Sequence, residues 1–89
     1  ISSGVTLAPL QLGPGVLGRI CDVAEAAGAV LQGLYPIGQH TAHSDADYPH
    51  KRVIIRFHAD DVALVVRALE AGGFPVLEAV DGRQHAPTA

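Results

Sequence analysis

The sequence repeats one short pattern twice, and this repeat limits the folds open to the chain more than any other feature. Each half holds an apolar stretch, an amphipathic segment and a second apolar stretch, which lie at residues 5–10, 15–27 and 29–37 and again at residues 52–58, 61–71 and 74–80. Alternating apolar residues predict strands, and apolar residues spaced by three and four predict helices. The chain therefore reads as two strand–helix–strand units joined end to end.

Glycine and proline mark the ends of these segments. Gly13-Pro14-Gly15 predicts a tight turn before the first helix. Gly28 follows that helix where a left-handed cap is expected, and Gly72-Gly73 ends the second helix in the same way. Pro9 cannot donate to a ladder, so we expect the first strand to end or bulge near it.

The second helix has a carboxylate at its predicted start. Asp60 is expected to be its N-cap, because an aspartate oxygen can accept from the free amides of a first turn. The buried stripe of this helix is expected to comprise Val62, Val65, Val66 and Leu69. Before it, Val53, Ile55 and Phe57 alternate plainly and predict the core face of a strand.

Two such units predict an α+β fold of the ferredoxin-like βαββαβ type. In this plan a four-stranded antiparallel sheet carries both helices on one face. Residues 1–80 are expected to form a single domain, and residues 81–89 a disordered tail. The second and fourth strands would be edges, and exposed edges tend to pair. A chain of 89 residues has a thin core, so a homodimer is expected.

Composition excludes several function classes. The net charge is −3 and no basic run extends beyond Lys51-Arg52, which argues against nucleic acid or an anionic membrane as a partner. No apolar run is long enough to cross a membrane. The lone Cys21 has no disulfide partner and fits a reducing, cytoplasmic compartment. No catalytic set of side chains can be assembled, so we expect neither an enzyme nor a cofactor.

The turn that opens the first helix carries a family resemblance. Pro14-Gly15-Val16-Leu17, the helix end at residues 24–28 and the βαββαβ order together resemble the ACT domain family over residues 5–80. The segment at residues 68–77 is similar to the ACT segment that follows paired CBS domains in acetoin-utilisation-type proteins. The resemblance implies a regulatory domain that is attached to other domains of a longer chain and binds amino acids at a dimer interface. The absence of methionine also indicates a piece of a longer protein.

Three positions depart from the pattern of the amino-acid-binding members. Leu10, Leu12 and Val30 stand where that family carries polar side chains. A buried ammonium without partners is costly, so a serine-like ligand held in the usual way is not expected. The amides that open the helix remain, and such amides favour a carboxylate. The expected ligand is an apolar amino acid, held between the turn of one copy and the second strand of another by Leu12, Gly13, Gly15, Val16, Leu17, Val30 and Gln32.

Other interpretations stay open at this stage. Gly13-Pro14-Gly15 is also simply a good turn and helix start. In that case the chain is a structural dimerisation module in which Leu10, Leu12 and Val30 replace the ligand. A third hypothesis is a metal-responsive module that uses His40, His43 and His50, since imidazole binds zinc or nickel. A solvated loop that happens to contain histidines is the alternative to such a site.

Overall fold

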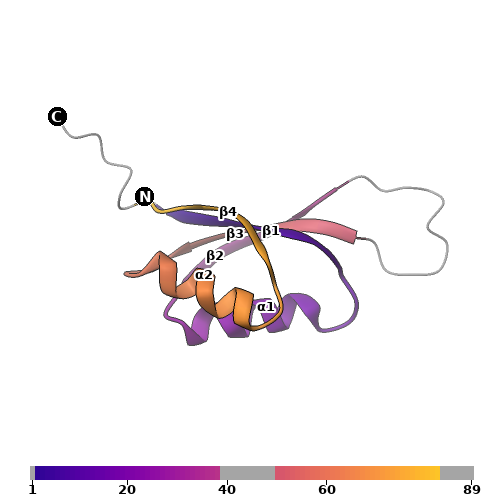
Figure 1. The fold of residues 1–89 in the computed structure, drawn as a ribbon, viewed down its shortest axis with the longest axis horizontal. Helices are drawn as coiled ribbons and strands as arrows, with labels where there is room; N and C mark the ends of the chain where they lie inside the picture. Colours follow the sequence, from indigo (N-terminus) through magenta and orange to yellow (C-terminus); the bar gives the residue numbers. More distant parts are fainter. Residues whose placement is uncertain (1, 39–49, 83–89) are drawn as a thin grey trace.

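The computed structural model describes residues 2–38 and 50–82. Its elements, in chain order, are β1 (Ser3–Gln11), α1 (Val16–Ala26), β2 (Val30–Ile37), β3 (His50–His58), α2 (Val62–Ala71) and β4 (Val76–Val80). The strands form one sheet in the order β2-β3-β1-β4, and every neighbouring pair is antiparallel. Both helices lie against the same face of this sheet, and the opposite face is open (Figure 1). The predicted ferredoxin-like βαββαβ sandwich is confirmed.

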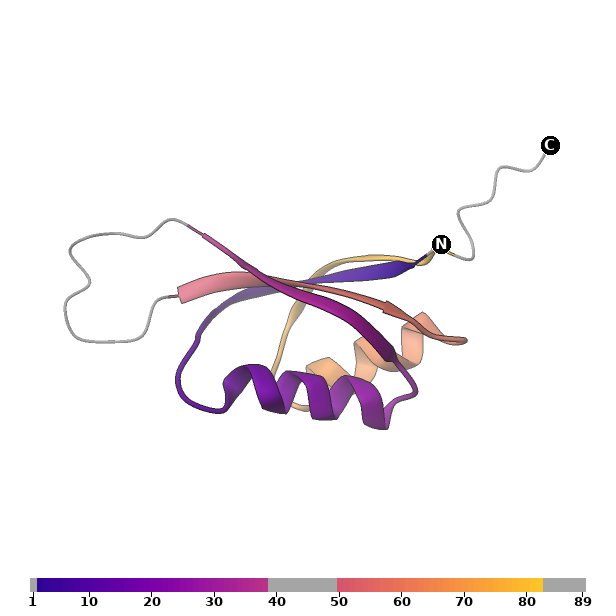
Figure 2. The ribbon, with the colours of Figure 1, turned by 180° about the vertical axis from the view of Figure 1, so that it is seen from behind.

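The core lies between the helices and the two central strands. Val53, Ile55 and Phe57 of β3 are fully buried, as their alternation predicted. Their register partners on β1, Val5 and Leu7, are buried beside them. The helices cover this layer with their apolar stripes, of which the fully buried members are Ile20, Ala24, Val65 and Leu69. Figure 2 shows from behind how α1 runs beneath the sheet.

Each of the three strand pairings contains one register shift. The pairing of β1 with β3 shifts between Leu7 and Leu10, the segment that contains Pro9, as predicted. On β2, Leu31 pairs with Phe57 and Gly33 pairs with Arg56, so Gln32 is an extra residue without a partner on β3. A bulge of this kind bends a strand and increases its local twist. The β4 ladder shifts in the same way beside Leu77, which lies between the paired residues Val76 and Glu78.

The helix ends follow the glycines. Gly28 has φ 99° and Gly73 has φ 95°, both in the left-handed region where glycine has no steric penalty. Both glycine amides donate to carbonyls of the preceding helix, at 3.0 Å to Glu25 O and 3.1 Å to Glu70 O. The Arg19 guanidinium ties the helices together, because it lies 5.3 Å from the Phe74 ring centre and donates to Gly72 O at 3.3 Å.

The predicted N-cap of α2 was wrong by one residue. Asp61, not Asp60, caps the helix: its Oδ1 accepts from the Leu64 amide at 3.1 Å. The helix therefore begins at Val62, so the third residue of the helix, Leu64, donates to the cap. Two adjacent aspartates offer the same side chain, and only the backbone conformation selects between them.

Removal of the Asp61 cap is expected to lower the stability of the folded state modestly. Asp61→Ala should lower the free energy of unfolding by about 1 kcal/mol, because the Leu64 amide loses its acceptor. Asp61→Asn is the matched control and should stay close to the unsubstituted chain, since asparagine caps about as well as aspartate. Urea denaturation followed by circular dichroism measures both. Equal losses in the two variants would show that the charge of Asp61, rather than its cap bond, is what matters.

The strand ends differ from expectation where backbone partners extend the ladder. β1 and β3 are longer than predicted, and β4 begins two residues after Phe74. Phe74 is nevertheless buried, and its amide donates to Leu69 O at 2.9 Å. Gly82, assigned to the predicted tail, is buried and donates its amide to Ser3 Oγ at 3.1 Å. Within residues 2–38 and 50–82, no helix is long and apolar enough to cross a membrane.

Candidate functional site

The turn before α1 presents backbone amides to solvent. Gly15 has φ 80° and occupies the N-cap position of α1, and no side chain accepts from the first turn. The Val16 amide bonds to Gly13 O at 3.3 Å, and Arg19 is the first residue whose amide reaches back to Gly15 O. The amides of Leu17 and Gly18 therefore lie in the turn where a helix has no internal acceptors. The first turn contains no acidic residue to offset the positive end of the helix dipole.

Space around this turn is open. A Cβ placed on Gly15 or Gly18 would meet nothing within 4 Å. Both residues are exposed. A small carboxylate could therefore reach these amides without a clash, and a carboxylate is the group that helix amides and dipole favour.

The apolar residues of the predicted site are occupied elsewhere. Leu12, Val16 and Leu17 are partly buried, and their side chains pack against the core. The turn therefore offers a ligand its backbone more than its side chains. Gly13, another residue of the predicted site, is also half-buried.

Val30 and Gln32 do not join this turn within one copy. Val30 pairs with His58 at one end of β3, whereas Leu10 pairs with Lys51 near the other end. Seven residues separate these β3 positions. At about 3.4 Å per residue this is about 24 Å along the strand. The predicted ligand residues can meet only if two copies contribute, and the same holds for the predicted apolar cluster of Leu10, Leu12 and Val30.

The metal hypothesis rests mainly on residues that lie outside the described part of the chain. His40 and His43 belong to residues 39–49, and His50 is exposed at the first position of β3, opposite Gln11. Among residues 2–38 and 50–82, no group of three or more potential ligands gathers in a way that could hold a metal ion.

Cys21 is a poor nucleophile. Its side chain is half-buried on α1. Burial raises the pKa of the thiol above its ordinary value, and the nearby carboxylates of Glu25 and Asp22 raise it further. The thiol therefore stays protonated at neutral pH, and a protonated thiol on a helix acts as a small packing side chain.

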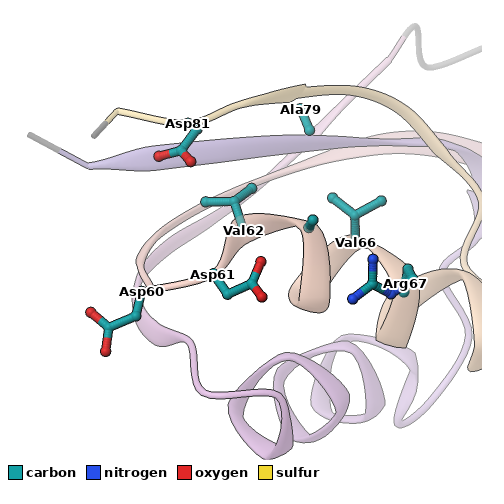
Figure 3. A pocket seen from close by; sticks show the side chains of 8 residues that line it. Asp60, Asp61, Val62, Val66, Arg67, Ala79 and Asp81 are labelled. Carbon is teal, nitrogen blue, oxygen red and sulfur yellow. The ribbon is translucent and has the colours of Figure 1, made fainter. Parts of the chain in front are cut away.

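Two surface hollows lie on or beside the helices, and no pattern in the sequence indicates either of them. One, of about 440 Å³, lies between α2 and β4 and is lined by Asp61, Val62, Arg67, Ala79 and Asp81 among others. In Figure 3 the Val62 and Val66 side chains lie between the helix and the sheet, and Asp60 points away. Its acidic groups are engaged: Asp61 caps α2, and neither Asp60 nor Asp81 is without a partner.

The second hollow, of about 520 Å³, runs between the two helices on their outer side. Its lining is apolar and mostly small: Val23, Ala26, Ala27, Leu64, Ala68, Ala71 and Gly72. No charged group lines it to orient a ligand. Of these regions, the turn before α1 offers the most specific chemistry.

Comparison with known proteins gives a likeness to a solved structure. No protein-family model matches the chain, and no curated protein matches it. Among solved structures, the regulatory subunit of aspartate kinase from Thermus thermophilus, in a ligand-free form, aligns with a TM-score of 0.62 and 12% identity. The alignment covers 89% of this chain and 48% of that subunit, so the chain spans about half its length. At this identity the likeness shows the fold, and the chain therefore has the ferredoxin-like βαββαβ fold of the ACT type.

Proposed function

We propose that the chain is a small regulatory module of the ACT type that senses an apolar amino acid at a homodimer interface. One observation carries the proposal: the first turn of α1 is uncapped by any side chain, carries no acidic residue and is open to a ligand. The ligand carboxylate would accept from the Leu17 and Gly18 amides. Serine, threonine, aspartate and asparagine cap a helix start with a side-chain oxygen, whereas Gly15 at the N-cap of α1 has no side chain to offer.

The second wall of the site would come from β2 of another copy. Val30 is 65% exposed and is the first residue of this edge strand. Gln32 lies at the bulge and has no register partner on β3. Pro36 has no amide to donate, so pairing along this edge is confined to the part of β2 before it. An apolar ligand side chain would cover Val30, and the Gln32 amide group is the nearest polar partner on that strand.

Regulation would follow from a shift in population. A ligand held by two copies binds one dimer geometry more tightly than others, and it shifts the equilibrium by that difference in affinity. Other domains of a longer parent protein would sense the geometry. The resemblance to CBS–ACT proteins supplies one such arrangement, in which this module has no enzymatic activity of its own and lies in the cytoplasm.

A purely structural dimerisation module is the second candidate. The packing of Leu12, Val16 and Leu17 onto the core favours it, because these side chains leave little apolar surface for a ligand. The two candidates differ in one property: only the first predicts that an amino acid raises the melting temperature.

Gly18 offers a sharp test. Gly18→Glu places a carboxylate at the third position of α1, where it stabilises the helix through the dipole and competes for the free amides. The variant should melt higher than the unsubstituted chain and lose any amino-acid-dependent rise in melting temperature. Gly18→Ala is the matched control, because it gains helix propensity of about 1 kcal/mol without a side chain that reaches the free amides.

The measurement is a thermal-shift screen of the twenty amino acids against the three chains. The proposal expects one or a few apolar amino acids to stabilise the unsubstituted chain and Gly18→Ala, but not Gly18→Glu. A full response in Gly18→Glu would place the ligand elsewhere. A screen in which no amino acid stabilises the unsubstituted chain would leave the structural module as the function.

A further inference from the structure

The open face of the sheet carries more apolar surface than a solvated face needs. The residues concerned are Val80 (50% exposed), Tyr35 (48%) and Ile37 (41%). By register, Tyr35 pairs with Ile54 and Val80 pairs with Gly4, positions that alternate with the buried Ile55 and Val5. Antiparallel sheets with one solvated face normally place polar residues there. Tyr35 and Ile37 are neighbours on this face of β2, and a cluster of exposed apolar side chains indicates a surface that is covered in the working protein.

Small and large residues occupy neighbouring strands of this face. β1 contributes Gly4 and Thr6, whereas β3 contributes their register partners, Arg56 and Ile54. The small side chains leave a hollow of about 270 Å³ over β1. Its remaining wall is formed by Glu78 and Val80 of β4, which pair with Thr6 and Gly4 from the other side.

We propose that a second copy of this chain packs on the open face, related by a two-fold axis that runs between β1 and β3 along the strands. This axis lays β3 of one copy over β1 of the other, and β2 over β4. Ile54 then meets the partner's Thr6, and Arg56 meets the partner's Gly4. Side chains of large and small size interdigitate at each level, which is the packing that two sheet faces require.

The outer strands complement each other in the same way. Tyr35 lies across Gly33, since a Cβ on Gly33 would lie 2.6 Å from the Tyr35 Cζ atom. Val80 pairs with Gly4, Gly4 pairs with Arg56, and Arg56 pairs with Gly33, so these four residues form one row across the sheet. The two-fold axis therefore brings Val80 onto the partner's Tyr35 ring, an apolar contact on both sides of the dimer.

Charge and size also favour a second copy as the occupant. Arg56 donates to Ser2 Oγ at 3.0 Å and stays exposed. The axis places Arg56 one strand away from the partner's Glu78, which is within reach of a guanidinium. Four strands at about 4.8 Å and about six residues at ~3.4 Å give a face of roughly 400 Å² per copy. Two such faces bury roughly 800 Å² in total, which is the range of weak, transient contacts, so the dimer should be weak and depend on concentration.

Two substitutions of matched exposure test the interface. Val80→Glu puts a carboxylate on the open face, and Leu64→Glu puts one on the helix layer, where Leu64 is 45% exposed. In sedimentation equilibrium on the full chain, Val80→Glu should weaken the dimer at least tenfold, and Leu64→Glu should leave it unchanged. A chain that is monomeric at every concentration, or a dimer weakened only by Leu64→Glu, would overturn the proposal.

A charge exchange covers the case in which Val80→Glu fails to fold. Arg56→Glu and Glu78→Arg should each weaken the dimer, and the double variant should restore it at least in part. Lack of restoration would count against the proposed axis. The inference is independent of the proposed function: Gly18→Glu should leave the open-face dimer intact, and Val80→Glu should leave an amino-acid response intact.

Discussion

Phe57→Ala should come close to unfolding the domain. Phe57 is the largest of the fully buried side chains, and it lies on the central strand β3 between Ser3 of β1 and Leu31 of β2. Truncation of a buried phenylalanine costs about 3–5 kcal/mol, through lost transfer free energy and the cavity that remains. Domains are stable by only about 5–15 kcal/mol, and one of this size belongs near the lower end.

Urea denaturation followed by circular dichroism measures the loss. The matched control is His58→Ala, because His58 is the next residue on the same strand and is exposed. It should change the free energy of unfolding by less than about 0.5 kcal/mol. Similar losses in the two variants would mean that the alternation of β3 does not define the core, and the fold described here would then be wrong.

The fold was predictable because local and long-range signals agree. Val53, Ile55 and Phe57 alternate, and each has an apolar partner or a helix stripe opposite it. Gly28 and Gly73 adopt the positive φ that their positions after the helices predicted. When turn chemistry and apolar spacing point to the same elements, few topologies remain.

Element boundaries were less predictable because they depend on bonds between distant residues. His50 and Lys51 extend β3 since Gln11 and Leu10 lie opposite them. The choice of Asp61 over Asp60 as the cap depends on backbone angles that the sequence does not encode locally. The bulge at Gln32 likewise depends on where β2 meets Phe57 and Arg56 of β3.

The candidate site was predictable in its backbone but not in its side chains. Gly13-Pro14-Gly15 predicted an open helix start, and Gly15 has the left-handed conformation that such a turn needs. The sequence could not show that Leu12 and Leu17 pack inward, because their apolar character serves a core and a ligand equally well. The apolar open face was missed for a different reason: unbroken alternation along β2 would place Val30 and Tyr35 on opposite faces, and the bulge at Gln32 brings them to the same face.

Leu69→Ala should cost about 2–5 kcal/mol and thereby show which side of α2 holds the layers together. Leu69 is fully buried, and its carbonyl also accepts from the Phe74 amide at 2.9 Å. Leu64→Ala is the same substitution on the same helix at a residue that is 45% exposed. The change in helix propensity is shared, so the difference between the two variants reports burial alone. Thermal denaturation should separate their midpoints clearly, since 1 kcal/mol corresponds to roughly 4–8 °C in a domain of this size. Equal midpoints would mean that α2 does not pack on the sheet through Leu69. In that case the sheet would lack the helical cover that leaves only its opposite face free for a partner.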